Sequence, residues 1–138
     1  MTSNRTILIT GVTGNQGGAV AKALQATGFS LRGLTRKPDS QRAAALARQG
    51  IDVVKGDLDD EATLRRALAG AWGVFGVQNA AEAGVEREEG QGKRLATLAR
   101  EAGVEHYVYT SVGSADKQTG VPHFDNKWRI EETVRGLR

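Results

Sequence analysis

Short apolar runs alternate with longer amphipathic segments along the whole chain. The apolar runs are rich in β-branched and aromatic residues and are bounded by glycine or charge, which is typical of buried strands; they cover residues 5–10, 29–35, 51–56, 72–77 and 106–112. The segments between them have Ala and Leu at helical spacing and end in glycine, which favours helices; they cover residues 17–28, 39–50, 59–70 and 85–103. A polar tract over residues 114–124 predicts a loop, followed by a last helix from about Asp125.

This strict alternation, with its short connections, predicts one fold class. Consecutive strands that are separated by a helix run parallel, their crossovers are right-handed, and the helices cover both faces of the sheet. We therefore predict an α/β protein built on a Rossmann-type, doubly wound parallel sheet of about five strands. A chain of 138 residues is long enough for a single domain with one core, so residues 1–138 are assigned to one domain.

The first strand leads directly into a glycine-rich turn, ITGVTGNQGG, at residues 9–18. Gly11 permits a tight turn, Gly14 lets the backbone approach a ligand without a Cβ atom in the way, and Gly17 or Gly18 allows the helix to pack close to the sheet. The N–H groups of the first helical turn lack partners inside the helix and so suit an anion. Between a strand and a helix, this G-x-x-G-x-x-G turn predicts binding of a dinucleotide pyrophosphate; a turn that binds nothing is the alternative.

The end of the second strand indicates which dinucleotide is bound. An acidic residue there would bind the ribose 2′-hydroxyl and repel a 2′-phosphate, but the sequence reads LTRKP and places Arg36 and Lys37 at this point. The planar guanidinium of Arg36 suits a phosphate, and Lys37 adds a second positive charge. We therefore predict NADP(H) rather than NAD(H), with a solvated basic turn as the alternative. Asp39, beyond Pro38, is better placed as a helix cap.

Two further strand ends carry polar residues that suit the same ligand. The ends of parallel strands meet at one edge of the sheet, where ligands of such folds bind. Asp57 is expected to accept a hydrogen bond from the adenine amino group, and Asp59 or Asp60 to cap the next helix, although a cap is a competing role for all three. The residues expected beside the central ribose and the phosphates are Gly76, Gln78 and Asn79.

Four stretches of the chain together resemble one known family. They are TGVTGNQGGAVAKALQATGFSLRGLTRKP, the GDLDD turn, YTSVGSAD and HFDNKWRIEE. They are similar to the NmrA-like group of atypical short-chain dehydrogenases/reductases, which includes NADP-sensing regulators, and the resemblance extends over essentially the whole chain. It implies an NADP(H)-binding Rossmann domain with the phosphates at Thr13, Asn15 and Gln16, the 2′-phosphate at Arg36, adenine near Asp57 and the nicotinamide ribose at Lys127.

The resemblance also raises the question of catalysis. Short-chain reductases use a tyrosine phenol as general acid, four residues before a lysine that lowers the pKa of the phenol. Here His123 stands four residues before Lys127, and neither of the two tyrosines is followed by a lysine at that distance. Ser111 stands where the family places the hydroxyl that orients a carbonyl. The candidate catalytic residues are therefore Lys127, Ser111 and His123, with His123 either donating a proton or, with Phe124, closing the cofactor pocket.

Composition excludes several other classes of protein. The chain has no cysteine, so it forms neither a disulfide framework nor a thiolate metal site, and no metal is predicted. Lys and Arg outnumber Asp and Glu by 19 to 16 with both signs interspersed, which does not favour a nucleic-acid partner. No apolar run approaches the roughly 20 residues that span a bilayer, and the first residues do not resemble a secretion signal. We expect a soluble cytoplasmic protein without a membrane partner.

Several functions remain open at this point. Members of the family usually continue beyond this length with a region that shapes a substrate pocket, so the chain is expected to be a truncated cofactor domain or a natural short form. The leading hypothesis is a redox-sensing module whose NADP(H) state is recognised by a protein partner. The alternative is an NADPH-dependent oxidoreductase that acts on a quinone or a carbonyl substrate, and a scaffold without nucleotide is the third. A poorly covered fifth strand predicts a homo-oligomer.

Overall fold

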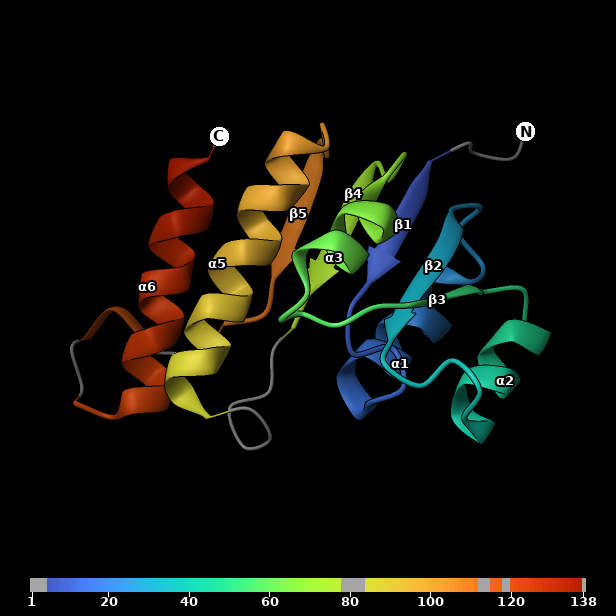
Figure 1. The fold of residues 1–138 in the computed structure, drawn as a ribbon, viewed down its shortest axis with the longest axis horizontal. Helices are drawn as coiled ribbons and strands as arrows, with labels where there is room; N and C mark the ends of the chain where they lie inside the picture. The colour runs from blue at the N-terminus through green and yellow to red at the C-terminus, as the bar shows by residue number, and fades with distance from the viewer. Residues whose placement is uncertain (1–4, 78–83, 112–114, 118–119, 138) are drawn as a thin grey trace.

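The computed structural model describes residues 5–77, 84–111, 115–117 and 120–137, without the side chains of Val85, Asp116, His123 and Phe124. A five-stranded sheet forms the centre, in the order β3-β2-β1-β4-β5 (Figure 1). Every pair of neighbouring strands in it is parallel. The strands are β1 (Thr6–Ile9), β2 (Ser30–Thr35), β3 (Asp52–Lys55), β4 (Gly73–Gly76) and β5 (His106–Tyr109). The predicted Rossmann-type α/β sheet of about five strands is confirmed.

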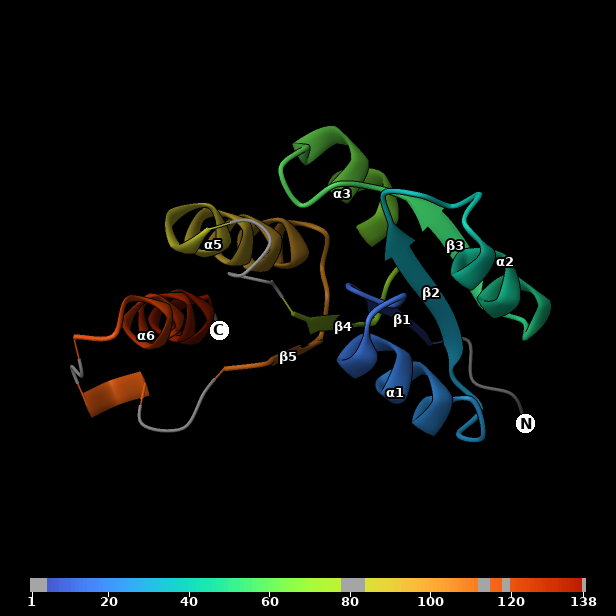
Figure 2. The same cartoon turned by 90° about the horizontal axis from the view of Figure 1, so that it is seen from below.

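Helices cover both faces of this sheet, as predicted. They are α1 (Asn15–Leu24), α2 (Gln41–Arg48), α3 (Glu61–Leu68), α5 (Val85–Glu101) and α6 (Pro122–Gly136), with a short 3-10 turn at Ala115–Lys117. Helices α3 and α5 pack on one face, α1 and α2 pack on the other, and α6 lies beside α5 (Figure 2). No helix among the described residues is long and apolar enough to cross a membrane.

The central strand β1 contributes to a separate apolar core on each face. Leu8 packs with residues of α3 and α5, whereas Ile7 and Ile9 pack with residues of α1 and α2. Because side chains alternate between the faces of a strand, three consecutive apolar residues are needed to supply both cores. Leu8 and Ile9 are completely buried. The run of apolar residues that predicts β1 is thus explained by burial on both sides.

Two predicted helix starts are wrong in detail. The last helix begins at Pro122 and not at about Asp125, because proline suits the first helical position, where its missing N–H would have no partner in any case. The N-cap of α2 is Ser40 and not Asp39: the Ser40 hydroxyl accepts a hydrogen bond from the Ala43 N–H at 3.2 Å. In both cases the helix begins at the residue that best suits a helix N-terminus: a proline that needs no N–H partner, or a serine whose hydroxyl caps an N–H group.

The topology identifies the edge at which a ligand would bind. β1 pairs with β2 on one side and with β4 on the other. The chain that leaves β1 therefore runs toward β2, whereas the chain that leaves β4 runs in the opposite direction, toward β5. A crevice forms at the carboxyl ends of the strands where the strand order reverses in this way. The glycine-rich turn after β1 lies at this edge, and α1, α5 and α6 all begin there (Figure 1).

Candidate functional site

The glycine-rich turn leaves β1 with its backbone anchored to the end of β4. Thr10 is completely buried, and its hydroxyl lies 3.1 Å from the carbonyl oxygen of Val77 and accepts the Val77 N–H at 2.9 Å. Gly11 follows with a φ of +60°, the left-handed conformation that a tight turn requires and that side chains disfavour. A Cβ atom at Gly11 would also approach Val77 Cγ1 to 2.9 Å. The turn is therefore fixed in one shape by the neighbouring strand.

Gly17 allows the first turn of α1 to lie directly against the glycine-rich turn. A Cβ atom at Gly17 would lie 2.2 Å from the carbonyl oxygen of Gly11, a backbone atom that cannot move aside. At Gly18 the nearest atom would be 3.5 Å away, which is an ordinary contact. Between the two glycines left open by the sequence, Gly17 is therefore the one that close packing requires.

The N-terminus of α1 faces this turn without a side-chain cap. Gly14 is the N-cap and supplies no side-chain hydrogen bond to the first helical turn, in which Asn15 and Gln16 are exposed. The exposed backbone of Gly14 has no Cβ atom to shield it, and Thr13 is half-buried beside it. Uncapped N–H groups at a helix N-terminus bind anions. These four residues thus have the geometry that a phosphate cradle requires.

Positive charge gathers next to this cradle from two elements. Arg36 and Lys37 follow β2 directly and are exposed, and the Lys37 N–H is held by the Thr35 hydroxyl at 3.1 Å. Arg42, near the start of α2, donates a hydrogen bond to the carbonyl oxygen of Thr13 at 2.9 Å. Sequence reasoning missed Arg42, because only the packing of α2 brings it to the glycine-rich turn. No acidic residue takes the place of Arg36 at the end of β2.

The three aspartates after β3 have three different roles. The Asp57 carboxylate is half-buried and accepts a hydrogen bond from the Asp59 N–H at 2.9 Å, which shapes the turn at the edge of the crevice. Asp60 is the N-cap of α3 and accepts from the Ala62 N–H at 3.0 Å. Asp59 does not cap; it forms an ion pair with Arg87 of α5 at 2.6 Å. The hydrogen bond from Arg87 lowers the pKa of Asp59, although partial burial opposes this shift.

Ser111 and Lys127 each have a carboxylate partner. The Ser111 hydroxyl donates a hydrogen bond to Glu131 of α6 at 2.9 Å. The Lys127 ammonium donates to Oε1 of Glu88, a residue of α5 that is completely buried. Both contacts lie at the carboxyl end of β5, so the structure brings these two candidates to the same end of the sheet. Glu88 and Glu131 gave no signal in the sequence, because they look like ordinary charged residues on amphipathic helices.

The two tyrosines of β5 are half-buried, and their hydroxyl oxygens are buried. Burial raises the pKa of the Tyr107 phenol. Burial also raises the pKa of Tyr109, and the negative charges of Glu88 and Glu131 raise it further. A raised pKa makes each phenol a weaker acid than a tyrosine in water. Among the other sequence candidates, Gln78 and the His123 side chain lie outside the described parts of the chain.

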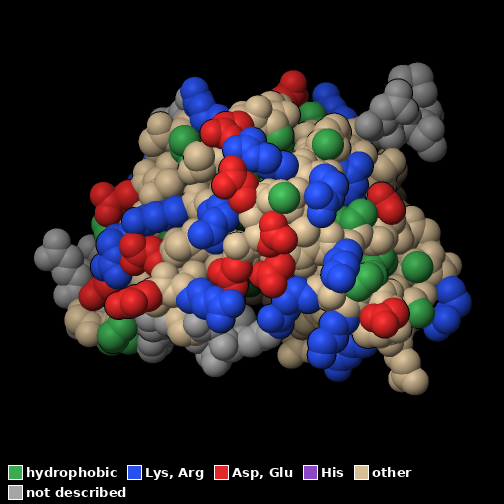
Figure 3. Space-filling view, viewed as in Figure 1, with side chains coloured by type: hydrophobic (Ala, Val, Ile, Leu, Met, Phe, Trp, Pro, Cys, Tyr) green, Lys and Arg blue, Asp and Glu red, His purple; other side chains and the backbone are tan. Residues whose placement is uncertain are grey.

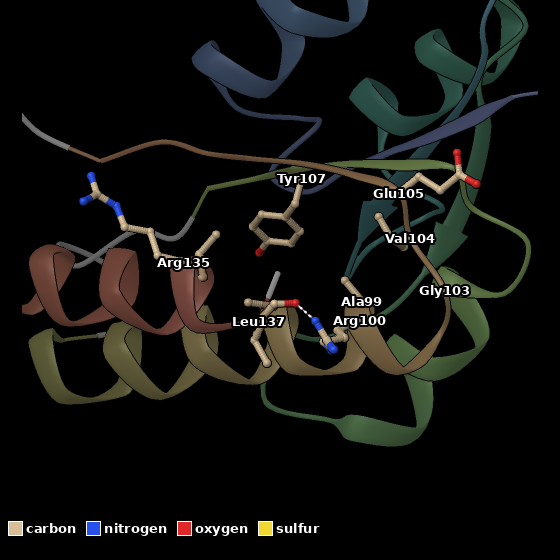
Figure 4. Close-up of a pocket in the computed structure, with 10 residues that line it drawn as sticks. Ala99, Arg100, Gly103, Val104, Glu105, Tyr107, Arg135 and Leu137 are labelled. Carbon is tan, nitrogen blue, oxygen red and sulfur yellow. Dashed lines mark hydrogen bonds between the residues drawn. The ribbon is translucent and has the colours of Figure 1, made fainter.

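A pocket with a volume of about 560 Å³ opens beside the amino end of β5, at the end of the strands opposite to the glycine-rich turn. It is lined by the last turns of α5 and α6 and by the start of β5, and Figure 4 shows the Tyr107 ring pointing from β5 toward the two helices. Arg100 crosses its rim and donates a hydrogen bond to the Leu137 carbonyl (Figure 4). Because the strands are parallel, the amino end of β5 is far from the glycine-rich turn. This pocket is not part of the crevice.

The face drawn in Figure 3 is not a continuous basic surface. On the face drawn in Figure 3, Lys and Arg side chains alternate with Asp and Glu side chains. Several of them are paired, as in Arg65 with Glu61 at 2.6 Å and Arg129 with Glu89 at 2.6 Å. Pairs at exposed positions stabilise the fold only slightly.

The residues present fit a dinucleotide. A Cβ atom would block the turn at Gly11 and Gly17, the helix N-terminus behind it is uncapped, and cations lie beside it. This combination at the point where the strand order reverses is that of a Rossmann-type fold, the class in which dinucleotides bind at such a turn. More narrowly, the chain belongs to the NmrA-like family, whose model matches residues 3–138.

Relatives of known structure or sequence agree with this assignment. The NmrA-like family domain-containing oxidoreductase FrzB of Cladobotryum sp is 37% identical over 95% of this chain and 42% of its own length. The NADPH-dependent quinone oxidoreductase of Escherichia coli, solved with NADPH, is 32% identical over 95% of this chain and 45% of its own, with a TM-score of 0.82. NmrA, a negative transcriptional regulator solved with NAD, is 25% identical over 97% of this chain and 42% of its own, with a TM-score of 0.81. The chain thus spans less than half the length of these relatives.

Proposed function

We propose that this chain is an NADP(H)-binding domain that reports the state of the cofactor. The observation that carries the proposal is the glycine-rich turn: Gly17 lets the first turn of α1 pack against the Gly11 carbonyl, and the N-terminus of α1 at this turn has no side-chain cap. Asn15 and Gln16 would hold the pyrophosphate through backbone N–H groups and polar side chains, with Thr13 adding a hydroxyl and Gly14, whose N–H donates to the Gly11 carbonyl, letting the phosphates approach the backbone. Asp57 is proposed to bind the adenine amino group, Gln78 to lie beside the central phosphates, and Lys127 to bind the ribose next to the nicotinamide.

Arg36 and Lys37 are proposed to select NADP(H) over NAD(H). An Arg36 guanidinium that binds the 2′-phosphate adds charge-assisted hydrogen bonds that NADH cannot form. We expect Arg36→Ala to weaken NADPH binding by about tenfold or more, the loss of one charged hydrogen-bonded contact, and to leave NADH binding nearly unchanged. Arg48→Ala, at the other end of α2, is the control and should alter neither affinity. Isothermal calorimetry with both nucleotides measures this, and equal NADH and NADPH affinities in the unaltered chain would contradict the selection.

The regulatory role is supported by the residue type at the position where short-chain reductases have their catalytic tyrosine. The position four residues before Lys127 holds His123 and not tyrosine, and the buried hydroxyls of the two tyrosines of β5 have raised pKa values. Lys127 and Ser111 are engaged by Glu88 and Glu131. A module of this kind would respond to the NADPH to NADP ratio by changing a surface that a protein partner recognises. A regulatory role also has a precedent among the relatives, because NmrA is described as a negative transcriptional regulator.

An NADPH-dependent oxidoreductase is the second candidate. It is supported by the curated relatives described as oxidoreductases and by the presence of Ser111 and Lys127 at the carboxyl end of β5. Bound NADPH would supply a hydride; this chain would contribute Ser111 to orient a carbonyl or quinone oxygen and His123 to donate a proton. Incubation with NADPH and a panel of quinones and carbonyls tests it. Tight binding without consumption supports the sensor, whereas consumption that is lost in His123→Ala supports the enzyme.

A further inference from the structure

The ion pair between Glu88 and Lys127 is the most deeply buried charged contact among the residues that the structure describes. Glu88 lies in the first turn of α5 and is 0% exposed, and the Lys127 side chain, in the second turn of α6, is 17% exposed. A charge in such a position is costly unless it is paired and hydrogen-bonded. The Lys127 ammonium therefore has a fixed partner, whereas a lysine side chain otherwise moves freely on its four-carbon stem.

The packing of α5 against α6 holds the pair in place. A Cβ atom at Gly92 would come within 2.7 Å of Ile130 Cδ1, so this glycine allows the two helices to approach closely. Gly92 lies one helical turn after Glu88, and Ile130 lies nearly one turn after Lys127, so the same close contact brings the pair together. Glu89 and Arg129 form a second bridge between the helices at 2.6 Å. The position of the ammonium is thus set by the backbones of two rigid helices.

The pair leaves hydrogen-bonding capacity unused. Glu88 Oε2 is buried and has no hydrogen-bonding partner among the described residues. The same holds for the hydroxyl of Tyr109, whose pKa is raised by burial and then by the charge of Glu88. An ammonium has three donors, and within the described parts of the chain only Glu88 accepts from Lys127. Buried polar atoms without partners are rare in folded proteins and often mark a binding or catalytic site.

We propose that Glu88 is a positioning residue that holds the Lys127 ammonium where it binds the ribose next to the nicotinamide. This inference rests on the proposed function and adds to it a residue on a different helix. A held ammonium keeps two donors for ribose hydroxyls, and it does not have to be drawn out of solvent when the dinucleotide binds. Glu88 would therefore contribute to the affinity for NADPH. It would not contribute to the affinity for adenosine 2′,5′-bisphosphate, which carries the 2′-phosphate but lacks the second ribose.

Comparison of these two ligands tests the proposal. We expect Glu88→Gln to weaken NADPH binding by about tenfold, the scale of one charged hydrogen bond, and to change the binding of the bisphosphate less than about twofold. Lys127→Met should have the same selective effect, and the double variant should bind no more weakly than Lys127→Met alone, because the two residues act as one unit. Glu86→Gln removes an exposed carboxylate of the same helical turn and is the control, with both affinities unchanged. Calorimetry measures all of these affinities.

The outcomes separate this proposal from the proposed function. If Glu88→Gln weakened the binding of both ligands equally, the role of Glu88 would be purely structural. If it weakened the binding of neither, Lys127 would act alone. Both results overturn the inference. If the unaltered chain bound neither ligand, the proposed function would fail and the inference with it. If Glu88→Gln does not fold, Glu88→Asp replaces it, because the shorter carboxylate keeps the charge but draws the ammonium back. It should weaken NADPH binding selectively, and unchanged NADPH binding would overturn the inference.

Discussion

Adding a methyl group would have different effects at Gly17 and Gly18, the two adjacent glycines of α1. At Gly17 the added carbon would lie 2.2 Å from a backbone oxygen, and at Gly18 it would have an ordinary contact at 3.5 Å. Both residues are helical, so their difference comes from the close approach of the turn and not from helix propensity. Sequence reasoning left this choice open, because the spacing of the motif accommodates both.

Gly17→Ala is therefore expected to destabilise the protein and to weaken nucleotide binding. The free energy of unfolding should fall by about 2 to 4 kcal/mol, as for overpacking against a rigid backbone. Gly18→Ala is the matched variant; it should be neutral or more stable by up to about 1 kcal/mol, because alanine favours a helix interior. Urea unfolding of the two variants measures both effects. Equal stability of the two would contradict the close contact.

At the scale of elements, ion pairs join α5 to the turn that follows β3. Asp59, after β3, pairs with Arg87 of α5 at 2.6 Å, and its pKa is lowered by that hydrogen bond. A carboxyl group whose pKa is lower in the folded state stabilises the fold above its unfolded pKa of about 4. That stabilisation is lost as the pH falls through the folded pKa.

Asp59→Asn should lower stability at neutral pH and not in acid. The side chains of Arg87 and Asp59 are 62% and 29% exposed, so solvent screens the pair and the loss at pH 7 is expected to stay below about 1 kcal/mol. The difference from the unaltered chain should shrink as the pH is lowered from 5 to 2. Urea unfolding across this range measures it, with Asp39→Asn, which does not cap α2, as control. A loss that is independent of pH would rule out the ion pair as its cause.

Features that depend on local sequence could be predicted, whereas features that depend on competition between neighbours or on distant contacts could not. The strands, the helices and the glycine-rich turn depend on local periodicity and on single residues, so their order and the parallel sheet follow from the sequence. The start of α6 at Pro122 and the Ser40 cap depend on competition between neighbouring residues for one helix terminus. Lys127 is 39 positions from its partner Glu88, and Arg42 is 29 positions from its partner Thr13. Contacts at this separation cannot be predicted from a local sequence pattern.

At the scale of the whole molecule, β5 forms one edge of the sheet. Within the described part of the chain β5 pairs only with β4, and Val108, at its centre, is 43% exposed. An edge strand with an exposed apolar residue can pair with another copy, and natural proteins often prevent this with a charged side chain. The predicted homo-oligomer would form through this edge.

The self-association of the 138-residue chain should therefore respond to a charge on β5. We expect sedimentation velocity to show association that grows with protein concentration and that Val108→Lys reduces strongly. Val108→Thr keeps a β-branched side chain without charge and should reduce it less. A chain that stays monomeric at every concentration, or a lysine variant that associates like the unaltered chain, would contradict this prediction.

We propose that NADPH binds where the glycine-rich turn meets the basic end of β2. The most direct test is a titration with NADPH followed in ¹H–¹⁵N correlation spectra of the labelled chain. We expect the largest shifts at the backbone N–H groups of Gly14, Asn15, Gln16 and Arg36. Spectra that do not change, or that change only at Arg100, Glu105 and Leu137 around the opposite pocket, would contradict it.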